Sequence, residues 1–226
     1  MTTEFQQHIL EQTVSFVQKQ LADDTTGHDW WHINRVHQNA KFIAEQEGAN
    51  TFVVELAALL HDIADWKLHD GDQSVGPVMA GEFLLAAEVD QAVIEQVCDI
   101  IATLSFKGAG VDSTMKTVEG QVVQDADRLD ALGAIGIARA FAYGGHFDRP
   151  LYDPNNSPVM HQSAEEYLNS SGATINHFYE KLLLLKDLMN TETGKILAEE
   201  RHRYLETFLE QFYSEWNGPT ESSHVQ

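Results

Sequence analysis

Cysteine is nearly absent from this chain of 226 residues, and with it any sign of an oxidising compartment. The single cysteine, Cys98, cannot form an intrachain disulfide. No neighbour that would activate its thiol is apparent, so we interpret Cys98 as a buried small hydrophobic residue rather than a nucleophile. The expected compartment is the cytoplasm.

Basic side chains are also scarce, since 14 Lys and Arg residues stand against 35 Asp and Glu residues, a formal net charge of −21. Such a charge repels the phosphate backbone of nucleic acid and an anionic membrane surface, both of which need clustered basic residues. Polymeric DNA or RNA is therefore excluded as an expected partner. A small anionic ligand can still bind where a metal ion and a few local cations outweigh the overall field.

Long hydrophobic runs are missing too. The longest apolar stretches, residues 51–60 and 182–185, are far shorter than the roughly 18 residues that a membrane span needs. Residues 1–8 lack the basic region that opens a secretory signal. We expect a soluble protein that does not enter a membrane.

Helical spacing of apolar residues recurs along the chain, whereas strand signals are almost absent. The pattern predicts an all-α fold. The expected helices cover residues 4–21, 29–48, 50–65, 78–87, 91–104, 118–130, 134–143, 164–188 (with a break considered at Gly172) and 192–216. Two irregular stretches, residues 66–76 and 144–160, are either binding segments or variable surface loops.

We expect one domain over residues 1–226. Its metal-binding core would span about residues 25–145, and C-terminal helices at about residues 163–216 would pack on that core. The apolar stripe from residue 178 through 188 to 212 is either internal packing or the seam of a homo-oligomer.

The doublet His-Asp occurs three times, and its second copy, His61-Asp62, stands apart because it follows a strongly apolar helix. Acidic groups near the C-terminal end of a helix oppose the helix dipole, and a bound cation would reverse that penalty. A short connection between two antiparallel helices would place His32, at the start of the preceding helix, beside this doublet. Asp127, between Ala126 and Leu129, supplies a fourth group.

Two imidazoles and two carboxylates suit one divalent cation with water in its remaining positions. Manganese is the first expectation for the ion held by His32, His61, Asp62 and Asp127, followed by magnesium, cobalt and nickel.

The ordered set resembles the HD superfamily of metal-dependent phosphohydrolases. Three motifs carry the resemblance over about two thirds of the chain: Gly27-His-Asp-Trp-Trp-His32-Ile-Asn-Arg35-Val36, His61-Asp-Ile-Ala-Asp65 and Asp125-Ala-Asp-Arg-Leu-Asp130. The resemblance implies an HD-domain helical bundle. Branches with two metals use two further His residues between the doublet and the last Asp, and only His69 lies there, so we expect one metal ion.

Further stretches resemble the bacterial YedJ/YpgQ-like branch of that superfamily: residues 61–67, 105–108, 127–139 and 149–153. This likeness implies a nucleoside phosphate as substrate, with hydrolysis of a (deoxy)nucleoside triphosphate to pyrophosphate as the first expectation. The alternatives are a 5′-nucleotidase, a (p)ppGpp-type hydrolase, and a non-catalytic HD module that senses a nucleotide or metal.

In this hypothesis the cation polarises a phosphoryl oxygen and lowers the pKa of its water. Asp65, four residues after His61 and on the same helical face, would accept the proton from that water; otherwise it is a solvated acid at a helix end.

Basic residues near the motifs are candidates for holding phosphate oxygens. Lys67 and Lys107 are otherwise surface charges, and Arg35 and Arg139 are otherwise members of structural ion pairs. Asp130, one turn beyond Asp127, would bind either ribose hydroxyls of the substrate or the imidazole of a metal ligand.

Overall fold

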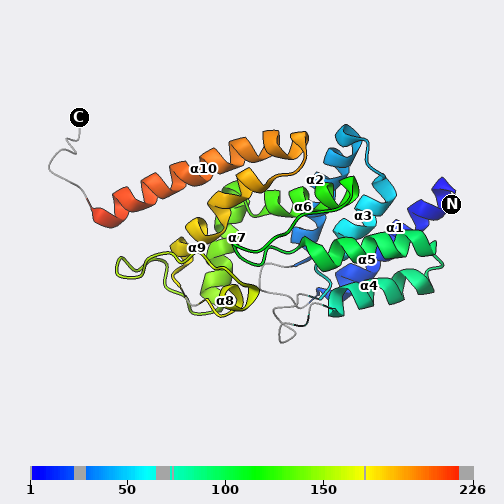
Figure 1. The fold of residues 1–226 in the computed structure, drawn as a ribbon, viewed down its shortest axis with the longest axis horizontal. Helices are drawn as coiled ribbons and strands as arrows, with labels where there is room; N and C mark the ends of the chain where they lie inside the picture. Colours follow the sequence, from blue (N-terminus) through cyan, green and yellow to red (C-terminus); the bar gives the residue numbers. More distant parts are fainter. Residues whose placement is uncertain (1, 23–28, 65–71, 73, 171, 219–226) are drawn as a thin grey trace.

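The computed structural model describes residues 2–22, 29–64, 72, 74–170 and 172–218. No strand occurs in these segments, so the predicted all-α class is confirmed. The elements are α1 (Thr3–Gln20), α2 (Trp30–Glu47), α3 (Thr51–Leu60), α4 (Val75–Ala86), α5 (Gln91–Leu104), α6 (Val118–Asp130), α7 (Gly133–His146), α8 (Ala164–Leu168), α9 (Thr174–Glu180), the 3₁₀ helix η2 (Leu182–Leu188) and α10 (Glu192–Asn217) (Figure 1).

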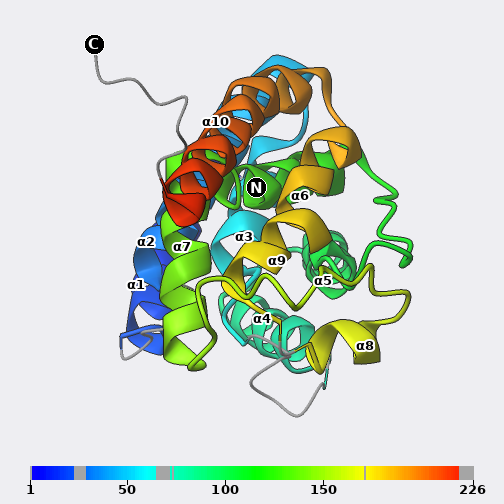
Figure 2. The same ribbon diagram turned by 90° about the vertical axis from the view of Figure 1, so that its left-hand side faces the viewer.

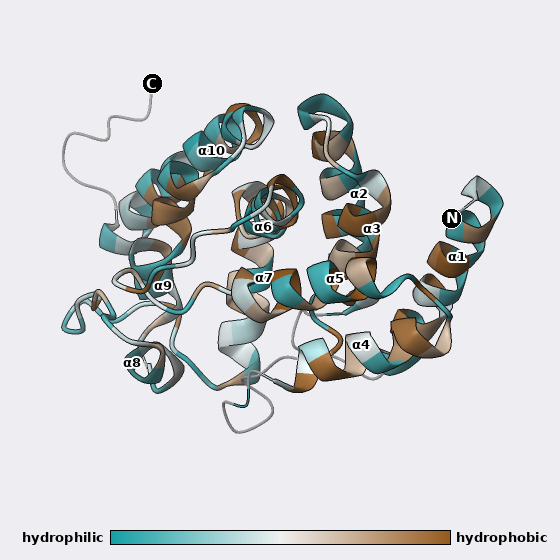
Figure 3. Cartoon of the chain, turned by 45° about the vertical axis from the view of Figure 1, so that its right-hand side comes forward, coloured by the Kyte–Doolittle hydropathy of each residue, from teal (hydrophilic) through white to brown (hydrophobic). Residues whose placement is uncertain are grey.

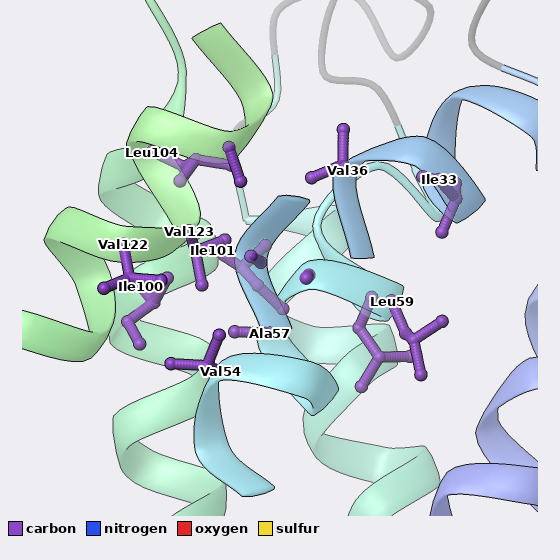
Figure 4. Close-up of a cluster of buried hydrophobic side chains, with 14 of the residues drawn as sticks. Ile33, Val36, Val54, Ala57, Leu59, Ile100, Ile101, Leu104, Val122 and Val123 are labelled. Carbon is purple, nitrogen blue, oxygen red and sulfur yellow. The ribbon is translucent and has the colours of Figure 1, made fainter. Parts of the chain in front are cut away.

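Helix α3 lies in the middle of the molecule, with α1 and α2 on one side and α5 and α6 on the other (Figure 2). Eight of its ten residues are buried, and a helix that is apolar all round must be covered on every side. Figure 4 shows the resulting core, in which side chains of α3 meet Ile33 and Val36 from α2, Ile100 and Ile101 from α5, and Val122 from α6.

The connection between α2 and α3 decides where the site lies. The Asp29 side chain accepts a hydrogen bond from the backbone N–H of His32 and so caps α2, which ends at Gly48 in the left-handed conformation. Asn50 caps α3 two residues later. This short turn brings the end of α3 back to the beginning of α2. The predicted extension of α3 to Asp65 is wrong, because the helix ends at Leu60 and residues 61–64 form turns.

Helix α10 packs on α7 and α6 and is held at its start by a buried carboxylate of α6. Asp125 accepts hydrogen bonds from the backbone N–H groups of Asn190 and Thr191 and from the Thr191 hydroxyl. In Figure 3 α10 alternates hydrophilic and hydrophobic residues, whereas α3 is mainly hydrophobic. The contrast fits a covering helix and a central one.

The helix predicted over residues 164–188, with a break considered at Gly172, is not continuous: Gly172 is not helical and lies between α8 and α9, and a second break follows at Lys181. The segment contains α8, α9 and η2, and Lys181 separates the last two with φ −141° and ψ −62°. Leu182 and Leu185 are buried three residues apart, which matches the repeat of a 3₁₀ helix.

The boundaries of two other helices shift by a few residues. Helix α4 starts three residues before its predicted beginning, and α7 extends to His146. The predicted irregular stretch 66–76 falls largely outside the described residues.

Among the helices that the structure describes, none is long and apolar enough to cross a membrane. The single-domain assignment, its internal boundaries and the cytoplasmic compartment stay predictions.

Candidate metal centre

Four side chains from three elements converge where α2 begins and α3 ends. His32 Nε2 lies 3.4 Å from Asp62 Oδ2 and 3.6 Å from Asp127 Oδ1. His61 Nε2 lies 3.6 Å and 3.8 Å from the same two oxygens. The predicted grouping of these residues in space is therefore present, while their binding of a metal stays a prediction.

The second nitrogen of each imidazole is held by the protein. His61 Nδ1 is 2.9 Å from the carbonyl oxygen of Ala58, so Nδ1 carries a proton, and in the neutral ring Nε2 carries the lone pair. His61 Nε2 is buried and has no hydrogen-bond partner within the described part of the chain. A buried lone pair of this kind is unfavourable unless a cation or a donor occupies the space in front of it.

His32 is also held at Nδ1, by a carboxylate in place of the carbonyl. Its Nδ1 lies 2.7 Å from Asp130 Oδ2, and the ring is fully buried. Asp130 also accepts hydrogen bonds from Arg35 Nε at 2.7 Å and Nη2 at 3.0 Å, and Arg139 Nη1 lies 3.2 Å from it. A carboxylate behind a ligating imidazole fixes the ring and raises its basicity.

These charges set the pKa values of both groups. Burial, the largest effect, raises the pKa of Asp130, but its hydrogen bonds with His32 and Arg35 and the charges of His32 and Arg139 outweigh it, so the net shift is strongly downward. Burial and the charge of Arg139 lower the pKa of His32, but the contacts with Asp130 and Asp62 raise it by more, so the net shift is upward. The carboxylates of Asp130 and Asp62 thus make the His32 ring more basic, a property that suits a ligating nitrogen.

The donor set fits a divalent cation. One donor atom each from His32, His61 and Asp127 lie within 4.8 Å of one another, and Asp62 approaches both imidazoles from the turn after α3. Nitrogen and carboxylate oxygen donors, with the Asp127 side chain 31% exposed, suit an ion that keeps positions open for water or substrate.

A cavity of about 570 Å³, including its mouth, adjoins this centre. Asp62 and Asp127 lie on its wall, together with Ser105 and Phe106 from the end of α5 and the loop beyond it. Arg139 from α7 and Lys181, between α9 and η2, supply cations to the same cavity. Arg128 from α6 also lines it, so a bound anion there would meet the two carboxylates of the metal centre and three basic side chains.

The remaining predicted site residues fall in different places. Asp65 and Lys67 lie outside the described residues. Lys107 is half-buried, and burial lowers its pKa, but among the described residues it is Phe106 and not Lys107 that lines the cavity. Arg35 contacts Asp130, so of the two roles considered for Arg35 the structure shows the ion pair. For Asp130 it shows contact with an imidazole.

Sequence reasoning missed Lys181. The residue reads as an ordinary position in a long amphipathic helix, and only the break between α9 and η2 turns it into a cavity residue. Arg128 donates hydrogen bonds to the Leu188 carbonyl and to the Ser113 hydroxyl and also lines the cavity.

Comparison with known proteins agrees with this geometry. The HD domain family matches residues 30–132, a range that includes His32, His61, Asp62 and Asp127. The uncharacterised protein YpgQ of Bacillus subtilis (strain 168) is 41% identical over 203 residues, 89% of this chain and 90% of its own. The chain belongs to the HD-domain family.

Solved structures give the same assignment. A protein from Lactobacillus plantarum superposes with a TM-score of 0.85 at 40% identity, covering 97% of this chain and 100% of its own. An HD-superfamily hydrolase from Bacillus thuringiensis superposes with a TM-score of 0.72 at 46% identity, covering 95% of this chain and 100% of its own. Bacillus subtilis YpgQ in complex with ADP superposes with a TM-score of 0.73 at 36% identity, covering 92% of this chain and 95% of its own.

HD domains bind divalent metals, and this chain has the fold of the HD-superfamily hydrolases with donors placed for such an ion. The resemblance noted from the motifs, including its YpgQ-like branch, is confirmed.

Proposed function

We propose that this HD-domain protein is a phosphohydrolase that cleaves a nucleoside phosphate with one divalent cation held by His32, His61, Asp62 and Asp127. The observation that carries the proposal is the cavity lined both by two of these donors, Asp62 and Asp127, and by the basic residues Arg128, Arg139 and Lys181. In a chain with a net charge of −21, a pocket with this charge distribution favours an anionic ligand that bridges a metal and basic side chains.

Manganese is the proposed ion, with magnesium, cobalt or nickel as substitutes. When bound, it supplies Lewis acidity toward a phosphoryl oxygen and toward the attacking water. The protein's part is to hold the ion and orient the substrate. Ala58 and Asp130 fix the two imidazoles, and Arg139 and Lys181 are placed to neutralise non-bridging phosphate oxygens. Asp65 remains the proposed acceptor of the water's proton.

The substrate proposed first is a (deoxy)nucleoside triphosphate, cleaved to a monophosphate and pyrophosphate. A nucleotide is supported by the likeness to Bacillus subtilis YpgQ, which was crystallised with ADP. A 5′-nucleotidase and a (p)ppGpp-type hydrolase would use the same donors, and a module that only senses nucleotide or metal would keep them without turnover. Polymeric nucleic acid is not a proposed partner, and a homo-oligomer remains open to test.

A hydrolysis assay separates these functions. The purified protein is given a panel of nucleoside mono-, di- and triphosphates with Mn²⁺, and orthophosphate and pyrophosphate are measured separately. We expect pyrophosphate from triphosphates, and loss of about 10³-fold or more in kcat in Asp62→Ala and Asp127→Ala. Asp99→Ala, an exposed position on α5, is the control. Bound metal with no turnover on any nucleotide would leave the sensor, and turnover that survives both substitutions would reject the proposed site.

A further inference from the structure

A second cavity lies between α7 and α9, and the metal centre does not account for it. Its empty space, open solvent at the mouth included, is about 920 Å³. Its walls include Ala140 and Tyr143 from α7, Thr174 and Glu180 from α9, and Tyr167 from α8. Helices α7 and α9 lie side by side below α10 in Figure 1.

The two cavities share a boundary. Ala131, Arg139 and Lys181 line both, so they stand where one cavity passes into the other. Two of these three residues, Arg139 and Lys181, are basic, although the whole chain has only 14 Lys and Arg residues. A ligand that extends from the metal centre into the second cavity would pass its anionic part between Arg139 and Lys181.

The walls beyond that boundary have different chemistry. Glu180 is 5% exposed; its Oε1 accepts a hydrogen bond from the Val159 backbone N–H at 2.9 Å, and its Oε2 lies 3.7 Å from His161 Nε2. The carboxylate would repel a phosphate, and its remaining lone pairs can accept hydrogen bonds from amino or hydroxyl groups. The Thr174 hydroxyl is buried and has no hydrogen-bond partner among the residues that the structure describes. Tyr143 and Tyr167 add aromatic surface. A neutral, donor-bearing, flat group satisfies these walls better than a second phosphate does.

Arg149, the third cation in this cavity, is engaged within the protein. It donates a hydrogen bond to the Ser170 carbonyl at 2.6 Å, and its guanidinium carbon lies 5.7 Å from the Tyr143 ring centroid. Its position fixes the aromatic wall and the segment before α9. Arg139 and Lys181 line both cavities, and Arg139 Nη1 also lies 3.2 Å from Asp130 Oδ2.

We propose that the cavity between α7 and α9 binds the nucleoside half of the substrate, while Arg139 and Lys181 hold the phosphates that connect it to the metal centre. The inference rests on the proposed function and adds to it a place for the base and sugar. Recognition then comes from Glu180, the Thr174 hydroxyl and the two tyrosines, and not from the metal-binding residues.

A filling substitution tests the proposal by binding, without any need for turnover. Ala140→Phe places a ring in the cavity, and Ala138→Phe makes the same change at an exposed position of the same helix. Calorimetry measures the Kd of a nucleoside diphosphate and of inorganic pyrophosphate for the Mg²⁺-loaded protein. We expect Ala140→Phe to raise the Kd of the diphosphate at least about tenfold and the Kd of pyrophosphate less than about twofold. Ala138→Phe should change neither Kd.

A second variant changes one hydroxyl and little else. Thr174→Val keeps the side-chain volume and removes a buried group that has no partner in the described chain, so the Tm should not fall. We expect the diphosphate Kd to rise about five- to tenfold while pyrophosphate binding is unchanged. Thr207→Val, at an exposed site on α10, is the control.

Three results would overturn the nucleoside subsite: no change in diphosphate affinity in either variant, equal weakening of diphosphate and pyrophosphate, or wild-type protein that binds the diphosphate no better than pyrophosphate. Each is read from binding alone. Failure of the proposed hydrolase function appears instead in the turnover of wild type, Asp62→Ala and Asp127→Ala, so the two failures are distinguishable.

Discussion

Asp130 stands behind His32, with its Oδ2 at 2.7 Å from Nδ1, so that Nε2 of the same ring faces Asp62 and Asp127 on the other side. The imidazole is therefore clamped between a structural carboxylate and the site carboxylates. Two arginines, Arg35 and Arg139, compensate the charge of Asp130. This layer behind the donors gives the site a fixed geometry before any ion binds.

Removing the charge of Asp130 should weaken metal binding without touching a metal donor. In Asp130→Asn the amide can still contact His32 but no longer favours the tautomer with a proton on Nδ1, and Arg35 and Arg139 lose their counter-charge. We expect Mn²⁺ affinity to fall about 10- to 100-fold, measured by titration calorimetry. Asp99→Asn on the exposed face of α5 is the matched control. An unchanged affinity would show that the carboxylate does not position the ring.

The same carboxylate should make stability depend on pH. Because the pKa of Asp130 is lower in the folded protein than its usual value, the folded state gains stability above the unfolded pKa of about 3.9 and loses it as the pH falls toward the folded value. Urea unfolding in a chelator, at pH 7 and at successive steps below pH 4, measures the effect. The difference in unfolding free energy between wild type and Asp130→Asn should shrink as the pH falls. A difference that stays constant would contradict the assigned shift.

Metal should stabilise the fold, because the donors come together only in the folded chain. At Mn²⁺ about 100 times its Kd, the expected gain in unfolding free energy is about 2.7 kcal/mol, seen as a higher Tm that EDTA reverses. His61→Ala removes a buried donor and should abolish this response. His8→Ala, at an exposed position on α1, should retain it. A Tm response that persists in His61→Ala would place the ion elsewhere.

The metal-site residues could be grouped from sequence because their signals are local. A His-Asp doublet after an apolar helix and a His in the first turn of the preceding helix need only one short turn to meet, and the turn at Gly48 and Asn50 is readable. Asp127 is grouped with them through its apolar neighbours Ala126 and Leu129, which is a weaker signal. Asp65 and Lys67 lie outside the described residues and stay predictions.

The cavity residues could not be predicted in the same way, because they depend on tertiary packing. The run of leucines at 182–185 fits a helix of 3.6 residues per turn as well as one of three, so the end of α9 and the exit of Lys181 into the cavity leave no sequence signal. The hydrogen bonds between Asp125 and the start of α10 join residues more than 60 positions apart, and the sequence gives no local signal for them either.

That link yields a final prediction about stability. Asp125 is fully buried, and its two oxygens accept bonds from the Asn190 backbone and amide and from the Thr191 backbone and hydroxyl. Asp125→Asn replaces an acceptor with an NH₂ donor facing other donors. We expect a loss of about 3 kcal/mol or more in unfolding free energy, measured by urea denaturation, whereas Asp99→Asn should change it by less than about 0.5 kcal/mol.

The effect of Asp125→Asn should be confined to stability. Asp125 joins α6 to α10, and the side chains that form the metal centre come from α2, the turn after α3, and α6. Folded Asp125→Asn should therefore bind Mn²⁺ within about threefold of wild type at low temperature, in contrast to Asp130→Asn, because one carboxylate holds a helix in place and the other holds a ligand. If Asp125→Asn cost less than about 1 kcal/mol, the link would not be what secures α10.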